Sequence, residues 1–355
     1  MIDLDDVQAY EDLDPSHMLE RIGELPHQCS EAWRSALAFR LPPGYASVDK
    51  VVILGMGGSA IGGDMLRGLA CGEGAAEVCV HRDYHLPPSV GERTLVIASS
   101  YSGNTEETLS AFSQALDTPA KTLAITTGGR LEAMARSKDV PVYCFKYDGE
   151  PRTAFGYSFF SLLAIAHKLR LVSVSPDDVD RVIRLLEGLT ERYDRATPLS
   201  ENPAKQMATS LHDRLGVVYG AGILSPVAFR WKTQLNENSK ASAFSESFPE
   251  LNHNAVVGYR FPTWLSDKLL VVMLRSPLLH RRVLKRYEVT AELLRQAGLS
   301  YTVFDAEGES ALGQMMSAVR FGDFVSYYLA ILNGVAPSPV AAIDYLKQRM
   351  AEGET

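Results

Sequence analysis

A chain of 355 residues is long enough for two ordinary domains, because a single hydrophobic core usually stops growing well before this size. Hydrophobic residues make up 46% of the chain and charged residues 22%, a balance that excludes a disordered or fibrous protein. The formal net charge of −8 argues against nucleic acid or an anionic membrane as a partner, since both favour clustered Lys and Arg.

The cysteines and the first residues predict a cytoplasmic protein. The four cysteines lie far apart without a C-x-x-C pair, which is typical of free thiols in a reducing compartment. Residues 1–6 lack the basic and apolar regions of a signal peptide, and no apolar stretch approaches the roughly 18 residues of a membrane span. We therefore expect neither export nor membrane insertion.

The first half of the chain changes from a helical to an alternating pattern. Residues 1–45 are helix-like, with an apolar periodicity between Pro15 and Leu37. Short β-branched runs then alternate with helical patterns and predict strands at residues 51–54, 76–80, 94–98, 122–126 and 140–145. This alternation is typical of a parallel, doubly wound sheet.

A second alternation follows two helices that we predict between residues 159 and 193. Its strands are expected at residues 216–220, 241–244, 268–274 and 300–304, before helical patterns at 315–332 and 339–350. The expected fold is α/β, with two doubly wound parallel-sheet domains, a helical N-terminal lead-in and C-terminal helices. The expected division is a lead-in at 1–45, a first domain at 46–158, linking helices at 159–205 and a second domain at 206–355.

A glycine-rich turn at residues 55–60 follows the first predicted strand and opens a helix. Such a turn lets backbone amides and a helix N-terminus approach an anion. Two other interpretations remain open. Gly55-x-Gly57-x-x-Ala60 also fits a relaxed dinucleotide fingerprint, and glycine can serve a tight turn by sterics alone.

A hydroxyl-rich loop at residues 99–108 follows the third predicted strand and opens another helix. Ser100, Ser102 and Thr105 could surround one phosphate, with the amides and dipole of the following helix adding positive potential. Capping of that helix by Ser102 or Asn104 would explain one such residue, but not all of them. The loop therefore predicts a phosphate site.

Both motifs together resemble the sugar-isomerase (SIS) domain, and specifically the bifunctional phosphoglucose/phosphomannose isomerases. The resemblance covers residues 48–350 and rests on two glycine- and serine-rich motifs and four later ones, in the family's order: Gly55-Met56-Gly57-Gly58-Ser59, Ser100-Tyr101-Ser102-Gly103-Asn104-Thr105-Glu106-Glu107-Thr108, Glu150-Pro151-Arg152, Gln234-Leu235-Asn236-Glu237-Asn238-Ser239-Lys240, Pro249-Glu250-Leu251-Asn252-His253-Asn254, and Lys347.

The resemblance implies a role for each matching residue. Sugar-binding and phosphate-binding residues would be Gly57, Gly58, Ser59, Ser100, Ser102 and Thr105, and the catalytic residues would be Arg152, Glu237, His253 and Lys347. A surface ion pair, a solvated carboxylate, a structural histidine and a solvated lysine are the ordinary alternatives for the last four. One departure is Ala336-Pro337-Ser338-Pro339-Val340, where the family is expected to have Asp-Pro-Thr-Pro-Val.

The implied activity is the interconversion of fructose 6-phosphate with glucose 6-phosphate and mannose 6-phosphate through a cis-enediolate, without metal or cofactor. Glu237 would move the proton between C1 and C2, Arg152 would stabilise the anionic oxygens, and His253 with Lys347 would open the ring. The resemblance also implies a homodimer, and leaves open which subunit's site His253 serves.

Three other functions remain as alternatives. One is a sugar-phosphate sensor without catalysis, and another is an isomerase for an amino-sugar or pentose phosphate. The third is a nucleotide-dependent dehydrogenase, which would leave the serine loop unused and offers only Asp83 as a ribose ligand.

Overall fold

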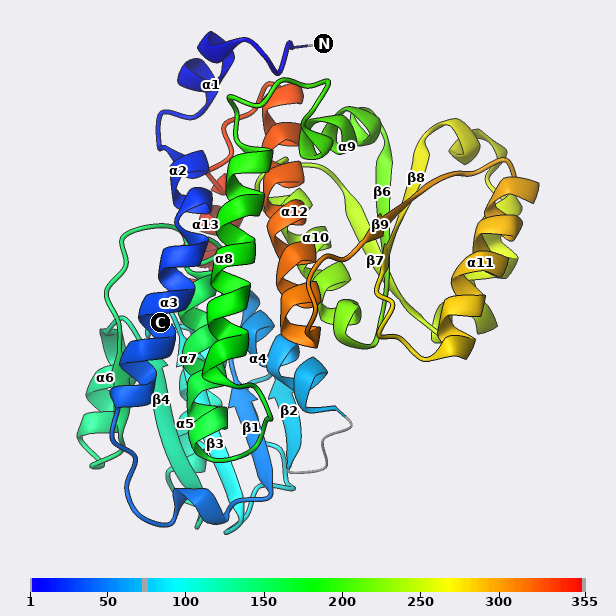
Figure 1. Ribbon diagram of the computed structural model, residues 1–355. Coiled ribbons are helices and arrows are strands. Elements are labelled where there is room, and N and C mark those ends of the chain that lie inside the picture. Colours follow the sequence, from blue (N-terminus) through cyan, green and yellow to red (C-terminus); the bar gives the residue numbers. More distant parts are fainter. Residues whose placement is uncertain (1, 72–75, 353–355) are drawn as a thin grey trace.

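The computed structural model describes residues 2–71 and 76–352, and its strands form two parallel β-sheets (Figure 1). The strands of the first sheet, given in spatial order, are β2 (Glu77–His81), β1 (Lys50–Leu54), β3 (Thr94–Ser100), β4 (Lys121–Thr126) and β5 (Val142–Cys144). Those of the second are β7 (Ala243–Phe248), β6 (Leu215–Ala221), β8 (Leu269–Arg275) and β9 (Ser300–Asp305). The predicted α/β class is confirmed.

Helices surround both sheets, as parallel strands require a crossover between them. In chain order the described helices are α1 (Val7–Leu13), α2 (Met18–Gly23), α3 (Leu25–Ala38), α4 (Gly57–Ala70), α5 (Glu106–Ala115), α6 (Gly129–Arg136), α7 (Phe155–Lys168), α8 (Pro176–Tyr193), α9 (Pro203–Leu211), α10 (Ser225–Glu237), α11 (Arg281–Gln296), α12 (Ala311–Leu332) and α13 (Ala341–Ala351). The short 3-10 helices are η1 (Tyr45–Ser47), η2 (Gly222–Leu224), η3 (Glu250–His253), η4 (Ala255–Arg260) and η5 (Thr263–Asp267).

The first sheet is covered by helices on both faces. Along β1, Val51 and Ile53 belong to the core that includes α3, α4 and α7, whereas Val52 and Leu54 pack with α5 and α6 on the opposite face. Successive side chains of a strand point to opposite faces. A strand between two helical layers is therefore buried throughout and reads as a continuous apolar run, as most of β3 does.

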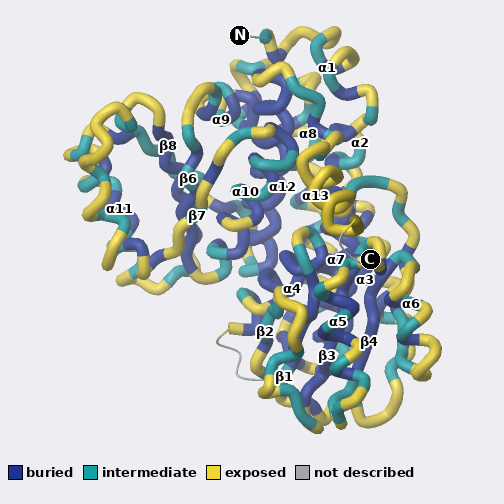
Figure 2. The backbone as a smooth tube through the Cα atoms, turned by 180° about the vertical axis from the view of Figure 1, so that it is seen from behind, coloured by how far each residue is buried: buried dark blue, intermediate teal, exposed yellow. Residues whose placement is uncertain are grey.

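Helix α12 lies at the centre of the molecule, between the two sheets (Figures 1 and 2). It packs against α8, α9 and α10, and nearly all of its residues are buried. A helix that is buried on all sides lies within a core. The buried Arg320 donates to the carbonyl of Ile22 and to the hydroxyl of Thr190, so α12 also holds the end of α2.

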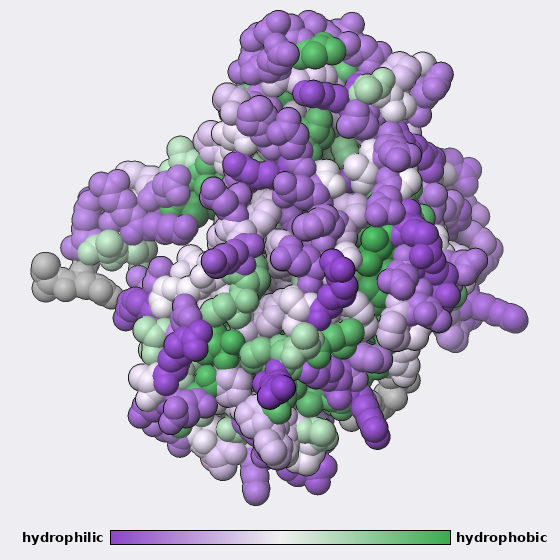
Figure 3. All heavy atoms as spheres, turned by 60° about the vertical axis from the view of Figure 1, so that its left-hand side comes forward, coloured by the Kyte–Doolittle hydropathy of each residue, from purple (hydrophilic) through white to green (hydrophobic). Residues whose placement is uncertain are grey.

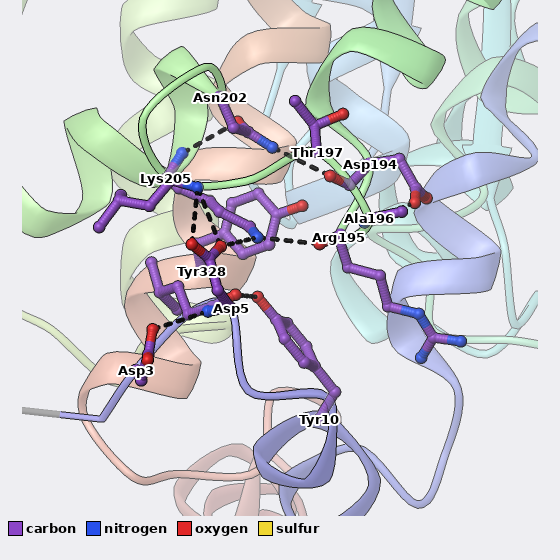
Figure 4. Close-up of polar contacts among 12 residues, drawn as sticks. Asp3, Asp5, Tyr10, Asp194, Arg195, Ala196, Thr197, Asn202, Lys205 and Tyr328 are labelled. Carbon is purple, nitrogen blue, oxygen red and sulfur yellow. Dashed lines mark hydrogen bonds and ion pairs between the residues drawn. The ribbon is translucent and has the colours of Figure 1, made fainter.

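A buried lysine anchors the N-terminal segment to the second half of the chain (Figure 4). The Nζ of Lys205, whose side chain is 0% exposed, donates to Oδ1 of Asp5 and to the carbonyl of Arg195, both at 2.8 Å. Asp5 also accepts from the amide of Leu199 at 2.9 Å. The Lys205 hydrogen bond, outweighing partial burial, holds the pKa of Asp5 below its ordinary value.

Two segments each expose several large apolar side chains: Val257, Phe261 and Trp264 around η4 and η5, and Ile343, Tyr345, Leu346 and Met350 on α13. On the face shown in Figure 3, hydrophilic side chains dominate and apolar ones gather in the lower half. No helix within residues 2–71 and 76–352 combines the length and apolar character that a membrane crossing requires.

Candidate active site

The carboxyl ends of β1 and β3 lie side by side in the first sheet. Leu54 is opposite Ala98 in the register of these strands, and β2 lies on the other side of β1. The crossovers leaving β1 and β3 therefore run in opposite directions, which creates a crevice where ligands of open α/β sheets bind. The glycine-rich turn after β1 and the serine loop after β3 both border this crevice.

Two glycines of the first turn are required for different reasons. Gly57 has φ of +49°, a backbone conformation that residues with a side chain rarely adopt. A Cβ on Gly58 would lie 2.9 Å from the carbonyl oxygen of Pro151, closer than real Cβ contacts allow. The glycine at position 58 thus lets the segment that carries Arg152 approach the N-terminus of α4.

Ser59 joins the two loops. Its buried Oγ accepts a hydrogen bond from the backbone amide of Tyr101 at 3.0 Å. A small cavity beside this contact is lined by Gly58, Ser59, Ser99 and Tyr101, among others. The Ser59 hydroxyl therefore positions the serine loop. Its predicted role in binding the sugar stays a prediction.

The serine loop brings two of its three predicted hydroxyls into contact. The Oγ of Ser100 and the Oγ1 of Thr105 are 3.1 Å apart at the N-terminus of α5. Within the described residues, the Thr105 side chain at the N-cap makes no capping hydrogen bond, so the first amides of α5 stay open to a ligand. Ser102 instead accepts from the amide of Asn104 at 3.2 Å and stabilises the loop itself.

Arg152 lies where the first half of the chain meets the second. Its side chain is 3% exposed, and its Nε donates to Oδ1 of Asn238 at 2.6 Å. Its Nη2 donates to the carbonyls of Pro337 and Ser338, at 2.8 Å each. Burial lowers the pKa of Arg152, although the nearby Glu237 opposes the shift. The guanidinium is therefore held in one orientation by contacts with distant segments of the chain.

Glu237 is the last residue of α10 and faces Arg152. Its Oε2 lies 3.6 Å from Nη1 of Arg152, and its side chain is 30% exposed, whereas the arginine is buried. A carboxylate that is partly open to solvent beside a fixed cation can reach a ligand from the crevice side. The fold thus brings together two residues that lie far apart in the sequence.

A buried polar network supports the end of α10. Asn238 donates to Oγ of Ser326 at 2.9 Å, and Gln234 donates to Oδ1 of Asp323 at 3.0 Å. Asp323 also accepts from Arg230, at 2.8 Å and 3.0 Å through its two carboxylate oxygens. Hydrogen bonds between buried polar groups hold them in one geometry, although Nε of Arg230 is left without a partner among the described residues. Helix α12 thereby fixes the helix end that presents Glu237.

Two residues next to Glu237 contribute to the site although the sequence alone gave them no role. Asn238 orients Arg152, and Lys240 donates from Nζ to the carbonyls of Glu237 at 2.7 Å and Pro337 at 2.8 Å. Both belong to the Glu237-Asn238-Ser239-Lys240 motif. The sequence signal that could have found Lys240 is its position just after the predicted helix, because a lysine there commonly donates to the last carbonyls of the helix.

The comparisons with known proteins agree with these motifs. A bifunctional phosphoglucose/phosphomannose isomerase from Caldicellulosiruptor bescii is 40% identical over 336 residues, which cover 94% of this chain and 99% of that relative. The chain belongs to this isomerase family. A family member from Thermoplasma acidophilum is 37% identical over 305 residues, covering 85% of this chain and 90% of its own. Residues 200–350 match the model of the bacterial phospho-glucose isomerase C-terminal SIS domain.

Solved structures show the same fold at lower sequence identity. A glucose-6-phosphate isomerase-like protein from Thermus thermophilus has a TM-score of 0.65 at 20% identity, covering 96% of this chain and 99% of its own. The C-terminal domain of glucosamine-fructose-6-phosphate aminotransferase from Francisella tularensis has a TM-score of 0.71 at 16% identity, with coverages of 91% and 98%. These likenesses support the fold of this isomerase family member and carry no further conclusion.

Two residues predicted from the isomerase family lie on the surface of the chain. His253 ends η3 and is exposed, and Lys347 lies on the exposed helix α13. Among the contacts of the described residues, no hydrogen bond or ion pair joins either of them to Arg152 or Glu237. The structure of one chain thus assembles the arginine and carboxylate half of the predicted site and leaves the ring-opening pair outside it.

Two further features bear on where chemistry on a sugar phosphate takes place, a second cavity and the arrangement of the side chains that can bind metal ions. A cavity of about 380 Å³ lies between α8, α9 and β9, away from the crevice, and includes Arg192, Gln206 and Asp305 in its lining. In the described part of the chain, His, Cys, Asp and Glu side chains form no group of three or more that could hold a metal ion.

Proposed function

We propose that this chain is an aldose/ketose isomerase that interconverts fructose 6-phosphate with glucose 6-phosphate and mannose 6-phosphate. The proposal rests on family membership and on one observation, the Glu237 carboxylate 3.6 Å from the buried Arg152 guanidinium, whose segment packs against the N-terminus of α4 at Gly58. A base, a fixed cation and a phosphate cradle are the groups that transfer of a proton through an enediolate requires.

The phosphate of the substrate binds at the serine loop in this proposal. Ser100 and Thr105 offer adjacent hydroxyls, and the first amides of α5 and the helix dipole favour an anion there. At Gly57 a Cβ would meet nothing within 4 Å, so the turn leaves space there, whereas Gly58 admits the segment that carries Arg152. Binding energy from the unreacting phosphate then holds C1 and C2 against the base.

Glu237 removes the proton from C2 of the open-chain aldose and returns it to C1, while the hydroxyl proton passes from O2 to O1, which yields the ketose. The two oxygens of the enediolate carry negative charge, which Arg152 stabilises without reorganising because its other donors are already bound. Glucose and mannose 6-phosphates differ only at C2, and C2 is planar in the enediolate. One site that presents either face of C2 to Glu237 serves both sugars.

We assign ring opening to His253 and Lys347 in a homodimer. The two residues lie on segments that expose large apolar side chains, with Phe261 77% and Trp264 67% exposed after His253, and Tyr345 66% exposed on α13. Exposed apolar groups of this size favour burial against another surface. A second copy of the chain that covers these segments supplies the missing half of the site.

We also propose that the protein acts in the cytoplasm. The four cysteines Cys29, Cys71, Cys79 and Cys144 are free thiols, which suits a reducing environment.

A second candidate function is supported by one relative. A D-glucosamine-6-phosphate 4-epimerase from Sulfolobus acidocaldarius is 33% identical over 218 residues, covering 61% of this chain and 66% of its own. The same scaffold therefore supports chemistry on an amino-sugar phosphate, and glucosamine 6-phosphate belongs among the substrates to be tested. A sensor without catalysis is disfavoured, because binding alone needs no carboxylate opposite the cation.

The deciding experiment incubates purified, chelator-treated protein with fructose 6-phosphate and quantifies glucose 6-phosphate and mannose 6-phosphate separately. Glu237→Gln removes the base, and Glu187→Gln on the exposed face of α8 is its matched control. We expect both products from the wild type and the control and neither from Glu237→Gln. Binding of fructose 6-phosphate without product in the wild type would refute the isomerase and favour a sensor.

A further inference from the structure

Lys240 folds back onto the end of the helix that carries Glu237. The residue has φ of +54°, which turns the chain sharply after α10. Its Nζ donates to the carbonyl of Glu237 at 2.7 Å, to that of Pro337 at 2.8 Å and to that of Asn238 at 3.4 Å. The last carbonyls of a helix have no partner within the helix, so a lysine can satisfy them.

The same lysine shares an acceptor with Arg152. The carbonyl of Pro337 accepts from Lys240 Nζ and from Arg152 Nη2, at 2.8 Å in each case. Lys240 therefore donates hydrogen bonds both to the backbone of Glu237, the proposed base, and to the Pro337–Ser338 turn, which also accepts hydrogen bonds from Arg152. The two cations repel each other, and the Arg152 charge contributes to the lowered pKa of Lys240.

The ammonium group has no donor left for a substrate. An ammonium has three N–H donors, and the three carbonyls account for them. Lys240 thus acts on the site only through Glu237 and the Pro337–Ser338 turn, and not as a proton donor to the sugar.

We propose that Lys240 is a positioning residue for the isomerase reaction, which fastens the Pro337–Ser338 turn to the Glu237 end of α10 and so sets the separation of Glu237 and Arg152. The inference rests on the proposed function. It predicts that loss of the ammonium spares substrate binding at the serine loop and weakens the transition state, because in the proposed mechanism Glu237 and Arg152 act on C1 and C2 and not on the phosphate.

The charge state of Lys240 provides an independent readout. Lys240 is exposed as a residue, but its ammonium lies against three carbonyls, and this partial burial, with the adjacent Arg152 charge, lowers the pKa of Lys240 to about 8, against the opposing effect of Glu237 and Glu150. The group is protonated below that pKa and neutral above it. The bonds to the three carbonyls therefore weaken as the pH rises through about 8.

The experiment compares wild type with Lys240→Met, Lys240→Arg and the control Lys138→Met, an exposed lysine after α6. We expect Lys240→Met to lower kcat for fructose 6-phosphate at least about tenfold while KM changes less than about threefold. In the wild type we expect kcat to decline above about pH 8, as the ammonium loses its proton. Lys240→Arg should recover part of kcat, and it should abolish this decline because arginine stays charged.

Binding of 5-phospho-D-arabinonate, a carboxylate mimic of the enediolate, separates the outcomes. Lys240→Met should bind this mimic at least about tenfold more weakly than wild type and bind inorganic phosphate equally well. An unchanged kcat and mimic affinity, with only a lower melting temperature, would show that Lys240 is a helix cap and overturn the inference. A wild type that makes no product and does not bind the mimic would refute the proposed function itself, and the inference with it.

Discussion

Ser59 and Tyr101 join the two loops of the candidate site through one hydrogen bond, from the Tyr101 amide to the buried Ser59 Oγ at 3.0 Å. The two segments also approach closely at their strand ends, since a Cβ on Gly55 would lie 2.9 Å from the Ser99 carbonyl. The turn after β1 and the loop after β3 are therefore joined by direct contacts. A change in either loop should alter both phosphate binding and the placement of the sugar.

Loss of the Arg152 cation should affect catalysis more than binding. We expect Arg152→Met to lower kcat by about 10²–10³, because a preorganised donor to the enediolate is removed. Since the buried Asn238 amide oxygen would also lose its partner, Arg152→Lys serves as a second variant that keeps the charge. Steady-state kinetics of each variant measures kcat and KM, and a thermal melt measures its stability. The control is Arg214→Met, which changes an exposed arginine. Unchanged kcat in both Arg152 variants would exclude the electrostatic role.

Changes in the serine loop should appear in substrate binding. Ser100→Ala and Thr105→Val each remove one hydroxyl of the pair that lies 3.1 Å apart. We expect KM for fructose 6-phosphate to rise about tenfold, the loss of one hydrogen bond to a charged group. Affinity for inorganic phosphate should fall in parallel. Ser113→Ala on α5 is the control, and an unaltered KM in both loop variants would place the phosphate elsewhere.

A methyl group at position 58 should displace the Arg152 segment. Gly58→Ala puts a Cβ at 2.9 Å from the Pro151 carbonyl, and neither backbone can yield cheaply. We expect a lower melting temperature and a kcat reduced at least about tenfold, since a small misplacement of a catalytic group is costly. Gly188→Ala is the matched control, because its Cβ would meet nothing within 4 Å on the exposed face of α8. That control should gain about 0.5–1 kcal/mol of stability.

The buried contact of the N-terminal segment should make stability depend on pH. Asp5→Asn removes the carboxylate from the fully buried Lys205 and should cost about 1–2 kcal/mol of unfolding free energy at pH 7. The pKa of Asp5 is lowered in the folded state, so the stabilisation is present above the unfolded pKa and lost as the pH falls through the folded pKa. Urea denaturation at pH 7 and in the acid range, beside Asp117→Asn, measures the difference. A cost that stays constant down to the lowest pH would contradict this origin.

Mixed dimers test which subunit's site His253 serves. Size-exclusion chromatography establishes the dimer first, and His253→Ala and Glu237→Gln should each be inactive alone. If His253 acts in the neighbouring site, an equal mixture refolded together should regain about a quarter of wild-type activity, because half of the dimers then contain one intact site. If His253 serves its own subunit, each site of the mixed dimer lacks one of the two residues, and no activity returns.

A tandem-linked heterodimer provides the converse measurement, with a chain that carries both changes joined to a wild-type chain. If His253 crosses to the neighbour, the doubly changed chain damages both sites and activity is lost. If His253 acts in its own subunit, the wild-type chain keeps one intact site and half of the activity remains. The two arrangements therefore give opposite results in each experiment.

Local sequence patterns were enough to establish the class of fold and the two loops. Apolar runs of β-branched residues predict buried parallel strands because helices on both faces leave no polar alternation, as β3 illustrates. The glycine-rich turn and the serine loop with Ser100 could be located from local pattern, since each lies between a strand and a helix, whereas the sugar-binding role of Gly57 was implied by the resemblance. Resemblance to the family supplied Arg152 and Glu237 as partners.

Packing between distant segments, which only the folded chain shows, fixes how those residues are held. Arg152 meets Asn238, Pro337 and Glu237 only because the end of α10 and the segment before α13 fold onto the segment before α7 that carries it. The link from Lys240 to Pro337 could not be predicted from spacing, since its acceptor is a backbone carbonyl, which every sequence contains. Contacts between distant segments depend on packing geometry, and no local pattern of residues encodes that geometry.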